Sequence, residues 1–384
     1  MPLFDPAEHE PLTESRWDEG RMRAGIERLV TRTLEALEPE RLWPRNELDD
    51  YGRLSDRDKG LWIGASGVLW ALDRLGAGIG EGGVYERYLA DPDVPDSPGL
   101  LNGETGVLLV SWRLAPTWAK EERLFELVTR SLASPDNELF DGVPGTMLAA
   151  LHLAESTGSE RWRTLWRTCA DQLWELFRPD PELGCRMWIQ HRRGRLIRSI
   201  GAGHGFASNA HSLLRGRALL GEERAAELDR SAAETAAALA VHDGDLVNWP
   251  TAADAFWAEQ FTTRVQWCHG APGLITSLGT LPPDETTDDL LSRAGDLVWL
   301  AGPLRKGAGL CHGTAGNGCA LLALHARTGD ERWLERARAF GVHALEQVDS
   351  AEPRHSLWTG GIGLALYLQA CIDGWQGMPI LDVL

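Results

Sequence analysis

The chain lacks several features that assign proteins to common classes. Its six cysteines in 384 residues show no close-set pattern of a disulfide-stapled secreted domain. No uninterrupted apolar run approaches the ~20 residues needed to span a bilayer, and residues 1–16 have neither the basic nor the apolar region of a signal peptide. Acidic residues outnumber basic ones, and the formal net charge of −18 argues against nonspecific binding to nucleic acid or anionic membranes. These absences predict a cytoplasmic protein without membrane insertion.

A glycine signature repeats along the chain. The pattern G-x-x-G, each time followed by an apolar, helix-like run, occurs six times. The first glycines of these copies are Gly64, Gly103, Gly142, Gly270, Gly313 and Gly360. A degenerate copy, His204-Gly205-Phe206-Ala207-Ser208, fills the gap between the third and the next complete copy. The first three copies are spaced by 39 residues, which is in the range of helical repeats.

Longer amphipathic segments precede the first copy and separate later ones. They mix apolar residues at three- and four-residue spacing with Arg and Glu, which is typical of helices with one wet face. They are Trp17–Leu37, Glu121–Leu132, Glu160–Phe177, Glu222–His242, Asp288–Leu300 and Asp330–Val348. One wet and one buried helix, seven times over, predict a closed double ring with the glycine turns at one mouth. An open solenoid is the alternative, but polar capping repeats are not evident.

The region from Cys185 to Ile200 departs from this pattern. Two short apolar runs flank the turn Arg192-Arg193-Gly194-Arg195, which predicts a small β-hairpin insertion near residues 186–200. It closely precedes His204, so we expect it to overhang the mouth of the ring. The alternative is an ordinary solvated loop.

Two of the glycine turns carry metal-ligand chemistry. They read Trp267-Cys268-His269-Gly270 and Leu310-Cys311-His312-Gly313. Thiols and imidazoles are the ligands that zinc prefers, and the irregular backbone of a glycine turn lets adjacent residues serve one metal. The predicted ligand set is Cys268, Cys311 and His312. Three protein ligands leave one tetrahedral position open, as in a catalytic zinc site. The alternative is that these cysteines are buried apolar residues and His312 caps a helix.

Five further residues are candidates for the same mouth. His204 stands before a glycine as His269 and His312 do, and an imidazole suits general acid or base chemistry near neutral pH; a structural role is its alternative. His269 is a candidate neighbour of the metal. Arg264, four residues before Cys268, is a candidate for holding an anionic group, with a surface salt bridge as the alternative. Glu138 and Asp141 precede the third turn and either is placed to reach the cavity.

These motifs, together with Leu357-Trp358-Thr359-Gly360-Gly361-Ile362-Gly363, resemble the lanthionine synthetase C-like family, the LanC-type cyclases and their relatives. The resemblance runs from about Trp17 to the C-terminus. It implies an all-α (α/α)7 toroid of seven inner and seven outer helices, which we expect to be a single domain over residues 1–384 with an irregular segment at 1–16. It also implies one Zn²⁺ per chain at Cys268, Cys311 and His312, an active-site histidine at His204, and an arginine near the metal at Arg264. Glu138 matches the family's acidic position before the third turn.

Two departures refine the resemblance. His269 stands where the bacterial cyclases usually carry Tyr, as in the broader LanC-like branch whose eukaryotic members bind glutathione. The fourth unit lacks its second glycine. The resemblance implies an enzyme that adds a cysteine thiol of a dehydrated peptide to dehydroalanine or dehydrobutyrine, with any dehydratase or kinase a separate protein. The alternatives are addition of a small thiol such as glutathione, a non-catalytic zinc- or thiol-binding module, another α/α toroid enzyme, and a structural zinc site. We expect a monomer, since a closed ring buries its own core.

Overall fold

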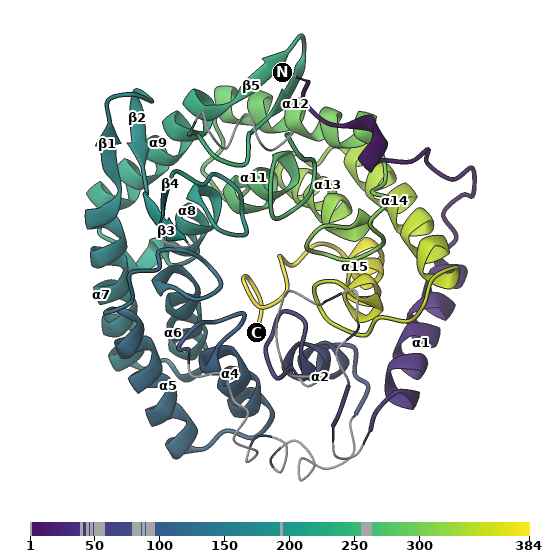
Figure 1. Cartoon of the computed structure of the whole chain (residues 1–384), viewed down its shortest axis with the longest axis horizontal. Helices are drawn as coiled ribbons and strands as arrows, with labels where there is room; N and C mark the ends of the chain where they lie inside the picture. The colour runs from purple at the N-terminus through teal and green to yellow at the C-terminus, as the bar shows by residue number, and fades with distance from the viewer. Residues whose placement is uncertain are drawn as a thin grey trace.

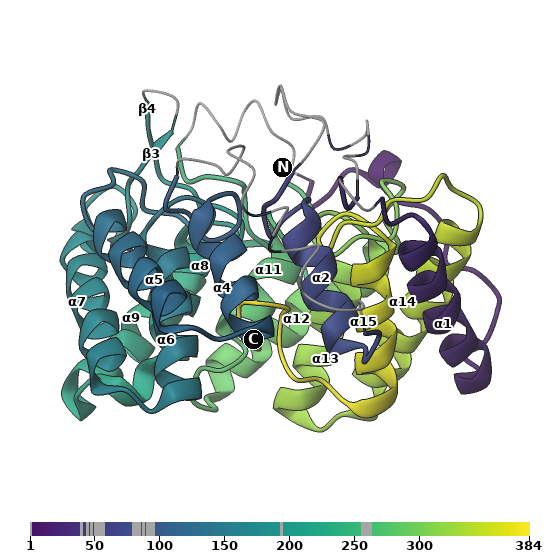
Figure 2. The same ribbon diagram turned by 90° about the horizontal axis from the view of Figure 1, so that it is seen from below.

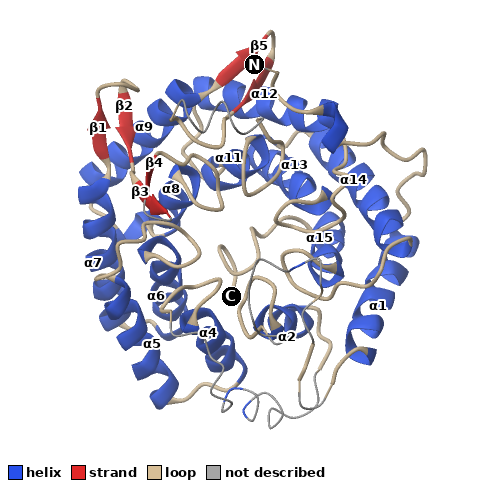
Figure 3. Cartoon of the chain, in the orientation of Figure 1, coloured by secondary structure: helices blue, strands red, loops and turns tan. Residues whose placement is uncertain are grey.

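Helices form two concentric rings in the computed structural model of the chain (Figures 1 and 3). The structure describes residues 2–38, 41–43, 46, 49, 58–78, 86, 89, 97–192, 195–254 and 263–384. The inner ring consists of α2 (Ala65–Arg74), α4 (Glu104–Leu114), α6 (Val143–Thr157), α8 (Phe206–Arg215), α11 (Ala271–Leu278), α13 (Thr314–Thr328) and α15 (Gly361–Asp373). Among the described residues the outer ring consists of α1 (Glu19–Glu35), α5 (Trp118–Ser131), α7 (Glu160–Leu176), α9 (Glu222–Leu239), α12 (Glu285–Ala301) and α14 (Glu331–Asp349). The predicted α/α toroid is confirmed, and the prediction of a seventh outer helix, between α2 and α4, concerns a stretch that lies mostly outside the described residues.

The two rings differ in composition because they differ in burial. The outer helices α1 and α12 begin at side-chain caps, with Asp18 accepting from the Arg21 N–H and Asp284 from the Thr287 N–H. The first eleven residues of the inner helix α13, from Thr314 to Leu324, are all buried. A helix that is apolar on all sides is stable only when surrounded, so the inner ring forms the core of the toroid.

The G-x-x-G signature reflects two close backbone approaches at each turn. A Cβ on Gly103 would lie 2.3 Å from the Gly99 nitrogen, and one on Gly106 would lie 1.9 Å from the Leu100 carbonyl oxygen. Glycine is therefore needed at both positions. The fourth unit keeps the same turn despite Ser208, because α8 still begins directly after Gly205.

Backbone hydrogen bonds link the seven turns in a circle that is open at one junction. In each link, the residue two positions before a unit's first glycine donates its N–H to the carbonyl of the equivalent residue in the next unit. The links are Trp62 to Leu101 (3.1 Å), Leu101 to Phe140 (3.2 Å), Gly203 to Cys268 (3.1 Å), Cys268 to Cys311 (3.1 Å), Cys311 to Trp358 (2.8 Å) and Trp358 to Trp62 (3.2 Å). Within the part of the chain that the structure describes, the junction between Phe140 and Gly203 has no such bond. The Phe140 N–H instead donates to Glu138 Oε2 at 3.2 Å. We call this junction the seam.

The described residues include three antiparallel hairpins outside the two rings: β1 (Arg178–Asp180) with β2 (Cys185–Met187), β3 (Gln190–Arg192) with β4 (Arg195–Ile197), and β5 (Val241–Asp243) with β6 (Leu246–Asn248). The predicted insertion near residues 186–200 is present as the β3–β4 hairpin, in which Gln190 pairs with Ile197. Its first residues belong instead to β2, where Met187 pairs with Arg178. Figure 2 shows β3 and β4 projecting beyond the helical rings.

The C-terminal segment folds back into the centre of the ring (Figure 1). Its residues Met378, Ile380 and Leu381 are buried. His211 of α8 contacts Asp382 at 3.2 Å between Nε2 and Oδ1, and His152 Nε2 lies 2.7 Å from the Ile380 carbonyl oxygen. The segment therefore packs against inner helices rather than extending away. None of the helices in the described ranges combines the length and apolar character needed to cross a membrane.

Candidate metal centre

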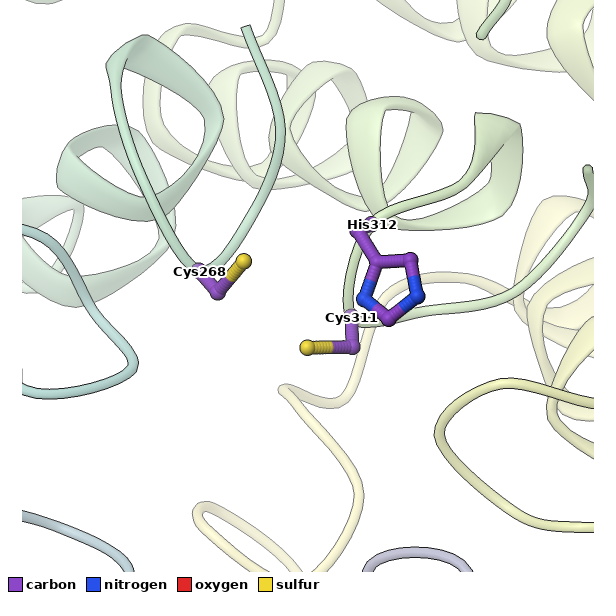
Figure 4. A group of neighbouring side chains, drawn as sticks. All are labelled: Cys268, Cys311 and His312. Carbon is purple, nitrogen blue, oxygen red and sulfur yellow. The ribbon is translucent and has the colours of Figure 1, made fainter. Parts of the chain in front are cut away.

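The circle of backbone bonds places the two predicted cysteine ligands side by side. Cys268 and Cys311 occupy equivalent positions in adjacent turns, and the Cys268 N–H donates to the Cys311 carbonyl at 3.1 Å. His312 follows on the second turn. One ligand atom from each of the three residues lies within 4.8 Å of the others, and Figure 4 shows the three side chains facing one shared space. Both cysteines are buried, at 9% and 3% exposure, while His312 is partly exposed. The sequence-predicted trio is thus brought together.

The backbone conformation of the turn that carries Cys268 differs from that of the turn that carries Cys311. Gly270 has φ +98°, and a Cβ there would lie 1.9 Å from the Arg264 carbonyl oxygen. In the sixth unit the first helical N–H, on Thr314, is capped by the Gly307 carbonyl at 2.9 Å. In the fifth unit the Asn248 side chain replaces that carbonyl, with Oδ1 accepting from Ala271 N–H at 2.7 Å. This arrangement fixes Cys268 through a side chain that is distant in sequence.

The two thiols are electrostatically unequal. The hydrogen bond that they share lowers the pKa of Cys268 well below its usual range and raises the pKa of Cys311 well above it. Burial opposes ionisation of both, while the nearby His269 and His312 favour the Cys268 thiolate. A thiolate is the form that binds a metal, so in the metal-free protein Cys268 is the thiol of the pair that is prepared to donate to a cation.

The donor set fits a soft divalent metal. Two sulfurs and one imidazole nitrogen are typical zinc ligands, and three protein ligands are typical of sites that keep one position open. Over the described residues, no fourth His, Cys, Asp or Glu joins the group.

His204 and Glu138 form a second cluster at the seam. His204 Nδ1 lies 2.5 Å from Glu138 Oε2, and the imidazole stacks on Phe140 with 4.5 Å between ring centroids. Glu138 is 5% exposed and also accepts the backbone N–H of Asp141 at 2.7 Å. Burial alone would raise the pKa of the Glu138 carboxyl, but the His204 charge and these hydrogen bonds outweigh burial and lower it. A carboxylate on Nδ1 orients the ring and leaves Nε2 for proton exchange.

The other predicted residues are placed differently. The pKa of Asp141 is raised by burial and by the Glu138 charge, and Ser97 Oγ donates to its carboxylate at 3.5 Å. The Arg264 carbonyl accepts from Asn248 Nδ2 at 3.1 Å. His269 pairs with Gln266 through backbone bonds of 3.0 and 3.1 Å. In the described part of the chain, neither Asp141 nor His269 belongs to the cluster of potential ligands.

Sequence reasoning missed two polar residues that shape the centre. Asn248 caps α11 from the end of β6, 23 residues earlier, and no local signal marks it. Gln266 donates from Nε2 to the Cys268 sulfur at 2.9 Å. Its position two residues before the cysteine is the one available signal, since alternate residues of an extended segment share a side.

The fold and the donor set together define an α/α toroid with a Cys2His group at one mouth. The chain belongs to the lanthionine synthetase C-like protein family, whose model matches residues 96–377. Its fold is similar to that of nisin cyclase, with a TM-score of 0.65 and 14% identity over 92% of this chain and 94% of that one.

Two curated relatives are similar in sequence. Glutathione S-transferase LANCL1 of Danio rerio is 32% identical over 180 residues, which cover 44% of this chain and 42% of the relative. LanC-like protein GCL1 of Arabidopsis thaliana is 38% identical over 111 residues, covering 26% of this chain and 25% of the relative. The similarity therefore spans less than half the length of either relative.

Proposed function

We propose that the chain binds one zinc ion through Cys268, Cys311 and His312 and adds a thiol to dehydroalanine or dehydrobutyrine, forming a thioether. The observation that supports this most is the convergence of the three ligand atoms within 4.8 Å from two adjacent turns. Zinc, when bound, would supply Lewis-acid activation that keeps a substrate thiol ionised at neutral pH. Two thiolates and a neutral imidazole offset the charge of the dication, which suits a site that must keep a thiolate reactive.

The His204–Glu138 pair supplies the proton chemistry in this proposal. Addition of sulfur to the β-carbon leaves an enolate that needs a proton at Cα. Glu138 holds Nδ1 of His204, and the stack on Phe140 fixes the ring plane. The Nε2 atom is then the proton donor to Cα. Arg264 is the candidate for stabilising the negative charge of the enolate oxygen.

The first candidate for the thiol is a cysteine within the dehydrated peptide, which gives a lanthionine or methyllanthionine ring. The second is glutathione, favoured by the name of the zebrafish relative, a glutathione S-transferase. Both donors use the same nucleophile and acceptor, so one assay compares them.

The test incubates zinc-loaded protein with two dehydroalanine peptides, one with a free cysteine and one without, the latter in the presence of glutathione. Mass spectrometry detects glutathione addition as a mass increase, and ring formation as unchanged mass with a thiol that no longer reacts with an alkylating agent. We expect Cys311→Ala to lose zinc and the activity. Cys319→Ala, which removes a buried thiol inside α13, is the matched control and should keep both. Full activity of Cys311→Ala without zinc would overturn the proposal.

A further inference from the structure

A chain of side-chain hydrogen bonds connects the N-terminal segment to the sulfur of Cys268. Glu8, the last residue of the short 3-10 helix η1 (Pro6–Glu8), contacts Lys306 at 3.1 Å between Oε2 and Nζ. Lys306 Nζ also donates to Gln266 Oε1 at 3.1 Å. Gln266 Nε2 donates to Cys268 Sγ at 2.9 Å. Glu8, Lys306 and Gln266, which come from three separate segments, are therefore connected one after another to the sulfur of Cys268.

This series of hydrogen bonds fixes which end of the Gln266 amide faces the sulfur. A lysine ammonium has three donors and no acceptor, so the amide atom that faces Lys306 is the oxygen. The amide nitrogen then points at Cys268. Gln266 is only 3% exposed, so water does not compete freely for its N–H. The orientation follows from donor and acceptor chemistry and does not depend on the assignment of N and O within the amide alone.

An N–H donor on a thiolate withdraws electron density from the sulfur. The proposed reaction needs this asymmetry, because two protein thiolates and one substrate thiol compete for the same electrophile. The substrate thiol must react, and the cysteine ligands must remain intact through each turnover. Hydrogen bonds to ligand atoms are a general means of setting how strongly they donate.

We infer that Gln266, oriented by Lys306, is a positioning residue that protects Cys268 from reacting with the electrophile and sets its donor strength toward the metal. The inference rests on the proposed function, since it requires that Cys268 be a ligand. It gives the N-terminal segment a part in the site, because Glu8 anchors Lys306.

The test uses Gln266→Met, which keeps a similar volume and removes the donor. Gln190→Met is the matched control, because Gln190 is also a buried glutamine but is not part of the series of contacts that leads to Cys268. Lys306→Met is a second variant at a side chain that is 33% exposed and so tolerates replacement. Each protein is loaded with Co²⁺, and the sulfur-to-cobalt charge-transfer absorption is recorded. The rates at which iodoacetamide alkylates Cys268 and Cys311 are then measured by peptide mass spectrometry.

We expect Gln266→Met to move the charge-transfer band to lower energy and to raise the ratio of Cys268 to Cys311 alkylation about tenfold, the change that ~1.4 kcal/mol gives, close to the contribution of a hydrogen bond to a charged group. Lys306→Met should change both in the same direction by less, and Gln190→Met should change neither. If the wild-type protein shows cobalt–sulfur bands but Gln266→Met and Lys306→Met leave the band and the alkylation ratio unchanged, the role of Gln266 is wrong while the metal site stands. Absence of those bands from the wild type would overturn the metal site, and the inference with it.

Discussion

Replacing Glu138 by Gln tests the acid–base half of the site. The carboxylate accepts three hydrogen bonds: at Oε1 from the Asp141 N–H (2.7 Å), and at Oε2 from the Phe140 N–H (3.2 Å) and His204 Nδ1 (2.5 Å). An amide keeps only one oxygen, so its NH2 group must face at least one of these donors. If the oxygen stays with Asp141, the NH2 faces His204 and favours the tautomer with an acceptor at Nδ1.

The expected loss is mainly in turnover. General acid catalysis contributes about 10²–10⁴-fold, so we expect the turnover of thiol addition by zinc-loaded Glu138→Gln to fall within that range, with zinc content unchanged. One buried N–H left without an acceptor costs about 1–3 kcal/mol, so the variant should fold but melt earlier. The assay is turnover by mass spectrometry alongside thermal unfolding and metal analysis.

Asp382→Asn provides the matched control for that variant. Asp382 is likewise a carboxylate paired with a histidine, His211; its side chain is 14% exposed, and it also accepts the Met378 N–H at 2.7 Å. It lies in the C-terminal segment, so we expect a similar loss of stability with turnover retained. Wild-type turnover in Glu138→Gln would refute the assignment of the pair to proton transfer. An equal fall in Asp382→Asn would show that the loss reports stability only.

The same carboxylate predicts a pH dependence of stability. The pKa of Glu138 is held below its ordinary value of 4.5 in the folded protein, so below that pH the unfolded chain binds more protons at this site than the folded one. Its contribution to the free energy of unfolding is therefore complete above about pH 4.5 and is lost as the pH falls toward the folded pKa. Denaturant unfolding between pH 7 and pH 3 should show a shallower decline in Glu138→Gln than in wild type, and equal slopes would contradict this.

Further predictions concern the metal and the turn that holds Cys268. X-ray absorption should find two sulfurs, one nitrogen and a light fourth ligand on zinc, with the light ligand replaced by sulfur when a thiol is added; a fourth protein ligand that thiol leaves unmoved would instead indicate a structural site. Gly270→Ala should cost at least ~3 kcal/mol and weaken zinc binding, because a side chain at φ +98° meets the Arg264 carbonyl. Gly329→Ala, also at positive φ but with no atom within 4 Å of the added Cβ, should cost about 1 kcal/mol and leave zinc binding intact. Both losses are measured as free energies of unfolding in denaturant. Equal losses in the two variants would argue against a specific need for glycine at position 270.

The sequence predicted the double ring because its signal is local and repeated. Each G-x-x-G turn needs glycine where a Cβ would meet backbone, as at Gly106 and Gly316, whose added Cβ atoms would lie 1.9 Å from a carbonyl oxygen. Such a requirement is visible in one sequence without tertiary information. The Cys-His-Gly turns were visible for the same reason, because the candidate ligands stand at fixed offsets from those glycines.

The polar residues around the ligands were beyond sequence reasoning because their contacts are set by the closed ring. Asn248 reaches Ala271 from 23 positions earlier, and Lys306 reaches Gln266 across 40 positions. Glu138 was a candidate by its distance from the third turn, but its bond to His204 joins residues 66 positions apart. Only the arrangement of units three and four as neighbours in the ring makes that contact.

The circle of turn-to-turn bonds explains why the Cys268–Cys311–His312 group is held by backbone bonds and the His204–Glu138 pair by a side-chain contact. The backbone of Cys268 is held on both sides, by bonds from Gly203 and to Cys311, and its sulfur accepts from Gln266 Nε2. This fixed arrangement suits a metal that demands constant geometry. At the seam the Phe140 N–H donates to the Glu138 carboxylate, and the neighbouring units are bridged there by the His204–Glu138 side-chain pair. The continuous part of the circle thus carries the candidate ligands, and its break carries the histidine to which the proposed mechanism gives proton transfer. If that mechanism holds, a substitution that closed the seam with backbone bonds should preserve metal binding and abolish proton transfer.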